Sequence, residues 1–349
     1  MTLETSGTIG VGEDLRVGIA GCGIRGSLFA AALAHQPGVR VVGMCDPAAK
    51  TRRQIAQVFS GAVVPHHDEL IGLGLDAFIV ATPDFAHREV AVAAAGAGLQ
   101  LMVEKPIATS TADAEEIQHA AVAAGVSCFV AFENRWNPYF RKLRRMVVAG
   151  ELGDIVSVTG VLSNSYYVPS TMLSWASRSS PAWFLMPHLL DLATWLTGQS
   201  PRSVTARGRR GELVSRGIDT WDAVHALIDL GGSTIANLQT AWVLPDGRPS
   251  IVDFRLDVVG TRGAVSVDHG DQGLHVATAD TYRSLTSLPE DVDGGEQSMA
   301  AWMVRAWARG LLAGDPVGPG AAYGVQITRA VEAVHQSAET GTIVHLDHT

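Results

Sequence analysis

The chain has 349 residues, of which 47% are apolar and 17% are charged. This composition is typical of a globular protein and argues against a disordered chain, and the length favours two domains over a single hydrophobic core. The net charge of -9 disfavours nucleic acid as a partner, because phosphate binding requires a basic surface and the Arg-rich stretch 141–145 is short.

No apolar stretch reaches the ~20 residues that cross a bilayer. The first fifteen residues lack the basic start and the apolar core of a secretory signal, so we expect a loose tail and a cytoplasmic protein. Cys22, Cys45 and Cys128 fall in or beside predicted strands without metal-ligand spacing. They are therefore interpreted as small buried residues, and we expect neither a disulfide nor a bound metal.

Short apolar runs alternate with helix-like stretches from residue 16 to residue 132. This alternation is typical of a parallel sheet with crossover helices, and Ser110 followed by Asp113 three residues later predicts the start of one such helix. We therefore predict an α/β, doubly wound Rossmann domain over residues 16–132. The predicted strands are residues 16–20, 39–45, 62–64, 77–81, 99–103 and 127–132.

All eight tryptophans lie after Phe132, where the pattern changes to longer alternating strands with one helix near residues 186–197. We predict that residues 133–349 form an α+β domain with an open, mostly antiparallel sheet. Two late amphipathic stretches, about 297–312 and 323–339, predict helices that pack back on the first domain. Because another subunit commonly covers an open sheet, we expect a homo-oligomer, either a dimer or a tetramer.

A glycine-rich motif joins the first predicted strand to an apolar helix. In this G-x-G-x-x-G pattern, Gly21 permits a tight turn, Gly23 lets a pyrophosphate approach the backbone, and Gly26 allows the helix to pack closely on the strand. The N-terminus of the following helix favours phosphate binding. The motif predicts a dinucleotide site formed by Gly21, Cys22, Gly23, Ile24, Arg25 and Gly26.

Asp46 ends the second predicted strand, 20 residues after Gly26. A carboxylate there accepts a hydrogen bond from the 2′-hydroxyl of NAD and repels the 2′-phosphate of NADP, so we expect NAD. NADP stays open as an alternative, because Lys50, Arg52 and Arg53 either neutralise such a phosphate or simply form an exposed helix face.

Two further motifs follow predicted strands, namely Thr82-Pro83 with His87, and Glu104-Lys105-Pro106. Together with the glycine motif they resemble the Gfo/Idh/MocA family, which includes glucose–fructose oxidoreductases and inositol dehydrogenases. The resemblance extends over nearly the whole chain. It continues through residues 134–138 (Asn-Arg-Trp-Asn-Pro), 150–153 (Gly-Glu-Leu-Gly), 188–191 (His-Leu-Leu-Asp) and 339–341 (Glu-Thr-Gly).

The resemblance implies an NAD(P)-dependent oxidoreductase that transfers a hydride between nicotinamide and a secondary alcohol or ketone of a sugar, glycoside or cyclitol. It implies that Lys105 and His188 are catalytic, with Lys105 beside the nicotinamide and His188 exchanging the hydroxyl proton. The position of Lys105 at a strand end suits this role, because an ammonium there stabilises a developing alkoxide. The further cofactor residues that it implies are Thr82, Pro83, His87, Glu104, Lys105 and Asn134.

The chain departs from the family's usual D-x-x-x-H-x-x-D pattern, because Phe184 occupies the first position. His188 is interpreted as catalytic or as a core histidine, and Asp191 as an orienting or a reacting group. Glu133, Asp219 and Asp222 are candidates for a substitute acid, and Pro187 predicts a helix start nearby. The residues expected to contact substrate, several of them aromatic side chains that stack on a sugar ring or belong to the core, are Lys105, Trp136, Tyr166, Trp175, Trp183, Phe184 and His188.

Two alternative functions stay open from the sequence. One is a lyase or glycosidase that acts through transient oxidation beside a glycosidic carbon. The other is a non-catalytic regulator that binds nucleotide and sugar, for which loss of the usual aspartate is the expected kind of change.

Overall fold

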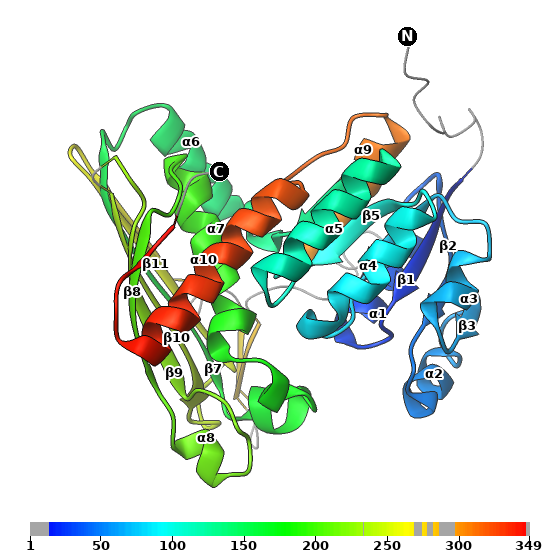
Figure 1. Ribbon diagram of the computed structural model, residues 1–349, viewed down its shortest axis with the longest axis horizontal. Helices are drawn as coiled ribbons and strands as arrows, with labels where there is room; N and C mark the ends of the chain where they lie inside the picture. The colour runs from blue at the N-terminus through cyan, green and yellow to red at the C-terminus, as the bar shows by residue number, and fades with distance from the viewer. Residues whose placement is uncertain (1–13, 233, 269–273, 278–281, 286–296, 347–349) are drawn as a thin grey trace. The chain divides into compact units, whose positions relative to one another are not determined.

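The computed structural model describes residues 14–232, 234–268, 274–277, 282–285 and 297–346 (Figure 1). The chain divides into two compact units. The N-terminal unit contains the described residues of Met1–Glu133 and Leu288–Val325, and the C-terminal unit those of Asn134–Ser287 and Gln326–Thr349. The predicted tail lies almost wholly outside the described residues.

The N-terminal unit is built on a parallel sheet in the order β3-β2-β1-β4-β5-β6. Strand β1 pairs with β2 on one side and with β4 on the other, so the strand order reverses there and a ligand crevice is expected at the carboxyl ends of these strands. The predicted Rossmann sheet is confirmed, with every strand end within one residue of its predicted position. The strands are β1 Leu15–Ala20, β2 Val39–Cys45, β3 Ala62–Val64, β4 Ala77–Val80, β5 Gln100–Glu104 and β6 Cys128–Ala131.

Local sequence signals explain where helices of this unit begin. The hydroxyl of Ser110 accepts a hydrogen bond from the backbone N–H of Asp113 (3.1 Å), which satisfies one unpaired donor at the start of α5, as predicted. The helices of this part are α1 Ile24–Ala34, α2 Ala49–Ile55, α3 His67–Ile71, α4 His87–Gly96 and α5 Thr111–Ala124, with a short turn η1 Asp84–Ala86.

Helix α9 (Met299–Leu312) lies in the N-terminal unit, whereas most of helix α10 (Ala321–Thr340) lies in the C-terminal unit. Helix α9 packs on α1, where Arg305 Nε donates to the carbonyl of Ala32 (3.0 Å). Helix α10 lies with the C-terminal unit from Gln326 onward. Within the C-terminal unit, Ser337 Oγ of α10 accepts the N–H of Ala206 (2.8 Å).

The C-terminal unit contains a sheet in the order β12-β11-β7-β10-β9-β8-β15, in which all neighbours are antiparallel except β7 and β10. Helix α7 packs on β7 and β10, and buried and exposed residues alternate along β9 and β10 (Figure 1). The predicted open, mostly antiparallel sheet is confirmed. Its strands are β7 Ile155–Ser165, β8 Ser203–Arg209, β9 Ala223–Asp229, β10 Ile235–Leu244, β11 Val252–Gly260, β12 Ala264–Asp268 and β15 Val344–His345.

The remaining elements of this unit are short. A separate hairpin pairs β13 with β14. The helices and turns are η2 Glu133–Trp136, α6 Pro138–Val148, η3 Val168–Met172, η4 Ala176–Arg178 and α8 Glu212–Ser215. The first residue of η2 is the last residue of the N-terminal unit. The two paired strands are β13 Leu274–Ala277 and β14 Tyr282–Leu285.

Helix α7 (Pro181–Thr197) starts two turns earlier than Pro187 predicted. Ser180 caps it by accepting from the N–H of Trp183 (2.9 Å), and Pro181 occupies the first turn, where its missing N–H costs nothing. Pro187 lies inside the helix, so the prediction of a start there was wrong. The earlier start places Phe184 one helical turn before His188.

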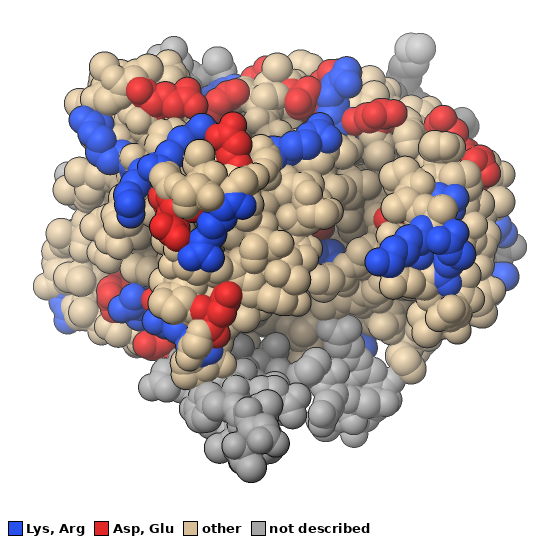
Figure 2. All heavy atoms as spheres, turned by 90° about the horizontal axis from the view of Figure 1, so that it is seen from below, with Lys and Arg blue, Asp and Glu red and all other residues tan. Residues whose placement is uncertain are grey.

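No helix within the described part of the chain is long and apolar enough to cross a membrane. Figure 2 shows acidic and basic side chains mixed along the left and upper parts of the face that it presents, and a group of basic side chains at the right.

Candidate active site

The glycine motif forms a tight connection between β1 and α1. Gly21 has a φ of +97°, in the left-handed region that favours glycine, and a Cβ there would collide with the carbonyl of Ala81. A Cβ on Gly26 would collide with the carbonyl of Gly21. These two glycines therefore let the loop, the helix and the neighbouring strand end approach one another, as predicted.

The space beside Gly23 is open. Apart from Gly23 and its two chain neighbours, no heavy atom of the described chain lies within 4 Å of the position that a Gly23 Cβ would occupy, and Gly23 precedes the first residue of α1. Thr82 follows β4, and its hydroxyl oxygen is buried without a hydrogen-bond partner among the described residues. A bound pyrophosphate would occupy the open space at this helix N-terminus. An adjoining group of the cofactor would give the buried Thr82 hydroxyl a hydrogen-bond partner.

Asp46 directly follows β2, as the motif requires. Its Oδ2 accepts the N–H of Cys22 (3.1 Å) and its Oδ1 accepts the N–H of Ala48 (2.8 Å), so the carboxylate is held at the glycine loop. Each carboxylate oxygen has a second lone pair, which leaves capacity for a ribose diol. Arg52 Nη1 donates to the carbonyls of Asp46 (2.7 Å) and Pro47 (2.8 Å), so this cation is held by the backbone of the same turn.

We expect Asp46→Ala to weaken NAD binding by roughly 10- to 100-fold, because a hydrogen bond from the ribose to a charged group is lost. NADP binding should weaken less or improve, since the repulsion of its 2′-phosphate disappears. Calorimetric titration of both cofactors checks this, with the thermal unfolding of the variant as the control for folding. Tighter binding of NADP than of NAD to the wild-type protein would contradict the assignment.

Arg25 lies between two carboxylates of the N-terminal unit. Its Nε donates to Glu104 Oε1 (2.7 Å) and its Nη2 donates to Glu133 Oε2 (2.6 Å). Burial alone would lower the pKa of the guanidinium, but the two carboxylates raise it above its ordinary value. Arg25 and Glu104, both predicted as cofactor residues, therefore bond to each other, and Glu133 is neutralised rather than positioned as a substitute acid.

Lys105 emerges at the carboxyl end of β5 and is 9% exposed. Its backbone N–H donates to Glu104 Oε2 (3.0 Å), so the Arg25–Glu104 pair also fixes the segment that carries the lysine. Burial lowers the pKa of the Lys105 ammonium, an effect that the Glu104 carboxylate partly offsets. A buried lysine with a lowered pKa is a typical proton acceptor in enzymes.

His87 joins two of the predicted cofactor segments. Its Nδ1 lies 2.9 Å from the carbonyl oxygen of Pro106, and its Nε2 lies 3.0 Å from the carbonyl oxygen of Thr82. His87 is almost fully buried and begins α4. Its contacts are to backbone carbonyls, so it holds the segment after β4 against the segment after β5.

In the C-terminal unit, two adjacent residues of η2 bind two residues of α7. The amide nitrogen of Asn134, predicted as a cofactor residue, lies 3.2 Å from His188 Nδ1. Arg135 donates to the fully buried Asp191 through Nε (2.9 Å to Oδ1) and Nη2 (2.6 Å to Oδ1). Asp191 is therefore paired with a cation, which favours the orienting role over the reacting one.

We expect Arg135→Met to lower the free energy of unfolding by about 3–5 kcal/mol, because it leaves the Asp191 carboxylate buried without its cation. Urea unfolding measures the change. Arg88→Met is the matched control, since Arg88 forms exposed ion pairs with Glu116 and Asp113 and their loss should leave stability nearly unchanged. Equal effects of the two substitutions would contradict the difference in burial.

The aromatic residues predicted to contact substrate pack against different partners within the C-terminal unit. Phe184 packs against Trp175 (ring centroids 6.1 Å apart) and against Trp242 (5.7 Å). Trp183 instead stacks on His335 of α10 (4.7 Å), and Arg216 lies over the ring of Tyr166 (3.9 Å). Trp136 ends η2 and is partly exposed.

The other two candidates for a substitute acid have different partners. Asp222 is buried and accepts the N–H groups of Glu212 (2.9 Å) and Leu213 (2.7 Å) at the start of α8. Asp219 forms an exposed ion pair with Arg210 (3.3 Å). Neither takes the place of the missing aspartate on α7, and within the described residues no group of histidine, cysteine and acidic side chains is arranged to hold a metal ion.

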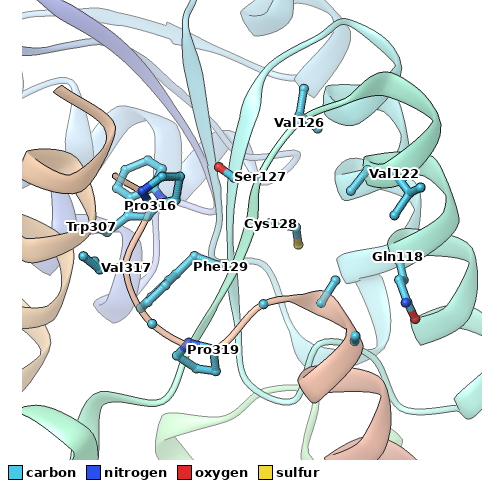
Figure 3. A pocket seen from close by; sticks show the side chains of 15 residues that line it. Gln118, Val122, Val126, Ser127, Cys128, Phe129, Trp307, Pro316, Val317 and Pro319 are labelled. Atoms are coloured by element: carbon cyan, nitrogen blue, oxygen red, sulfur yellow. The ribbon is translucent and has the colours of Figure 1, made fainter. Parts of the chain in front are cut away.

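A pocket of about 320 Å³ in the N-terminal unit lies apart from these residues. It is bounded by α5, β6 and the segment before α10 (Figure 3). Its lining includes Cys128 and Trp307 and none of the predicted site residues. The shape of the surface alone therefore does not locate the candidate site.

The chain is similar to known families and relatives over most of its length. Residues 15–132 match the family described as the oxidoreductase family with an NAD-binding Rossmann fold, and residues 140–266 match the GFO/IDH/MocA C-terminal domain. The glucose-6-phosphate 3-dehydrogenase of Bacillus subtilis (strain 168) is 30% identical over 295 residues, which cover 78% of this chain and 82% of the relative.

Two further similarities span almost the full length. Inositol 2-dehydrogenase 1 of Saccharopolyspora erythraea is 27% identical over 345 residues, which cover 95% of this chain and 96% of the relative. The crystal structure of scyllo-inositol dehydrogenase from Lactobacillus casei with bound NAD(H) and scyllo-inositol has a TM-score of 0.80. That match covers 95% of this chain and 99% of that chain at 18% identity, so it establishes a shared fold.

Proposed function

Because the chain belongs to the GFO/IDH/MocA family of NAD-binding oxidoreductases, we propose that it is an NAD-dependent dehydrogenase of a secondary alcohol on a cyclitol or sugar ring. The observation that carries this proposal is the pairing of an open glycine loop with Asp46 at the carboxyl edge of the parallel sheet. The names of the relatives support a ring polyol as the substrate class.

Residues of the N-terminal unit would hold NAD. The backbone at Gly23 and the N-terminus of α1 would bind the pyrophosphate, and Asp46 would bind the adenosine ribose. When bound, NAD supplies the nicotinamide ring that accepts or returns a hydride. The ion pair between Arg25 and Glu104 and the bond from the Lys105 N–H to Glu104 hold this carboxylate and the backbone of Lys105 together.

We further propose that Lys105 and His188 serve the reacting hydroxyl group. Both residues are almost fully buried, the backbone of Lys105 is held by the Glu104 carboxylate, and the imidazole of His188 contacts the Asn134 amide. Buried polar groups held in this way need no reorganisation when charge develops on the substrate oxygen. Phe184, one turn before His188, would contribute an apolar surface to substrate binding.

The experiment that tests this function is incubation of the protein with NAD or NADP and a panel of inositols, sugars, sugar phosphates and glycosides. We expect an increase in reduced-nicotinamide absorbance with NAD and at least one ring polyol, and a ketone product with the ring intact. Cleavage of a glycosidic bond without net reduced cofactor would favour the lyase or glycosidase. Binding of NAD without turnover of any panel member would favour the regulator.

For Phe184→Ala, we expect KM to rise roughly 10-fold while kcat changes much less, because an apolar ring shapes a binding surface and transfers no proton. Steady-state kinetics with the best substrate of the panel separates the two constants. A loss confined to kcat would show that Phe184 acts on the reacting groups rather than on binding.

We also propose that the chain forms a homo-oligomer through the exposed face of the C-terminal sheet. Leu227, Ile235 and Val259 share this face through the register of β9, β10, β7 and β11, and they are 52%, 50% and 43% exposed. These apolar side chains lie among polar and charged ones on the open face of the sheet, and an open sheet face with exposed apolar residues is commonly covered by another subunit. Sedimentation velocity distinguishes an oligomer from the monomer.

A further inference from the structure

The turn η2 is fixed against α7 by two neighbouring contacts within the C-terminal unit. Arg135 forms a two-nitrogen ion pair with Asp191, and Asn134 contacts His188. His188 and Asp191 are three residues apart and therefore lie on one face of the helix. The ion pair thus sets the position at which the Asn134 amide meets the imidazole ring.

The chemistry of this contact determines where the imidazole carries its hydrogen. The nitrogen of a side-chain amide can only donate, so His188 Nδ1 must accept across the 3.2 Å contact. A neutral imidazole has one donor and one acceptor nitrogen. When Nδ1 accepts, the hydrogen is therefore on Nε2.

We propose that Asn134 is a positioning residue that holds neutral His188 with its hydrogen on Nε2, so that His188 donates a hydrogen bond to the substrate oxygen. This inference rests on the proposed function for the substrate, and it differs from the expectation that His188 removes the hydroxyl proton. Asn134 and His188 are both almost fully buried, so water does not readily replace the amide at Nδ1.

If His188 donates to the substrate oxygen, a residue other than His188 must accept the proton of the substrate hydroxyl group. Oxidation of an alcohol breaks the C–H bond, whose electron pair leaves with hydrogen as hydride to the nicotinamide, and breaks the O–H bond, which releases a proton. An imidazole with hydrogen on Nε2 cannot take that proton from a group at Nε2. Of the two residues proposed to serve the hydroxyl group, Lys105 in its neutral amine form accepts the proton and becomes an ammonium.

Long-range ¹H–¹⁵N correlation NMR of protein labelled with ¹⁵N-histidine observes the tautomer directly. The spectrum is recorded without cofactor or substrate at about pH 8, above the ordinary histidine pKa of ~6.5. His188→Gln identifies the His188 signals. We expect Nε2 to have the chemical shift of a protonated nitrogen and Nδ1 that of an unprotonated acceptor.

His335 serves as an internal control with the opposite tautomer. Its Nδ1 lies 2.9 Å from the carbonyl oxygen of Val331, which can only accept, and its Nε2 lies 2.7 Å from the hydroxyl of Ser180. We therefore expect hydrogen on Nδ1 of His335 in the same spectrum. His335→Gln assigns its signals.

Asn134→Asp tests the role of the amide. A carboxylate can only accept, so His188 in this variant should carry hydrogen on Nδ1, and the shifts of its two nitrogens should exchange. Hydrogen on Nδ1 of His188 in the wild-type protein, or an unchanged His188 pattern in folded Asn134→Asp, would overturn the inference. The wild-type spectrum decides even if the variant fails to fold, and it does so whether or not the panel reveals a substrate.

Discussion

Replacing Lys105 with methionine is expected to lower kcat by roughly 100- to 10,000-fold, the usual range for a lost acid or base, while NAD still binds. The reason is that the buried amine is the proton acceptor and that, once protonated, it stabilises the oxygen from which the proton came. Steady-state kinetics and calorimetric titration of NAD measure the two properties separately. Lys142→Met, on the exposed surface of α6, is the control and should leave both unchanged.

The pH dependence and a second variant distinguish a proton acceptor from a fixed charge. Burial lowers the pKa of Lys105, so the neutral amine forms at a lower pH than for an ordinary lysine (~10.4), and kcat for oxidation should rise with pH and level off. Arginine stays protonated, so Lys105→Arg should be about as inactive as Lys105→Met. Substantial activity of Lys105→Arg would show that Lys105 contributes its charge and not a proton-accepting amine.

Gly23→Val is expected to abolish measurable NAD binding and to leave the protein folded. The backbone at Gly23 has φ -75° and ψ -165°, an extended conformation that valine adopts, and no described heavy atom beyond its two chain neighbours lies within 4 Å of its Cβ position. The new side chain would instead occupy the space that the pyrophosphate requires. Calorimetric titration of NAD, together with thermal unfolding of the variant, tests both parts of the prediction.

Gly96→Val is a matched control at the end of α4, where the Cβ position is equally open. It should leave NAD binding unchanged, because it lies outside the glycine loop. Wild-type affinity of Gly23→Val for NAD would show that the open space beside the loop is not the phosphate site.

The N-terminal unit was predictable from the sequence because its signals are local. Each strand is a short apolar run, Gly21 and Gly26 of the motif have steric reasons that the structure reproduces, and Ser110 marks its helix through a contact three residues away. The resemblance to the Gfo/Idh/MocA family, carried by the same motifs, is confirmed by the family matches of both parts of the chain.

The contacts that organise the candidate site were not predictable, because they join residues far apart in the sequence. Asn134 and His188 are separated by 54 positions, and Arg25 and Glu133 by 108. The sequence pattern assigned Asn134 to the cofactor and left the role of Asp191 open, since nothing local indicates which side chain each one meets.

The start of α7 shows how one local signal overrides another. Pro187 is compatible with a first helical turn, but Ser180 and Pro181 supply a complete start six residues earlier, and packing on β7 and β10 holds the rest of the helix. Prediction from a single proline could not weigh that packing.

The most direct test of the proposed dehydrogenase follows the hydride itself. The best substrate of the panel, carrying deuterium at the reacting carbon, is incubated with the wild-type protein and NAD, and the reduced cofactor is analysed by mass spectrometry. We predict that the reduced cofactor carries one deuterium and that the substrate becomes a ketone with its ring and glycosidic bonds intact. Reduced cofactor without deuterium, or bond cleavage with the cofactor recovered in its oxidised form, would contradict the account.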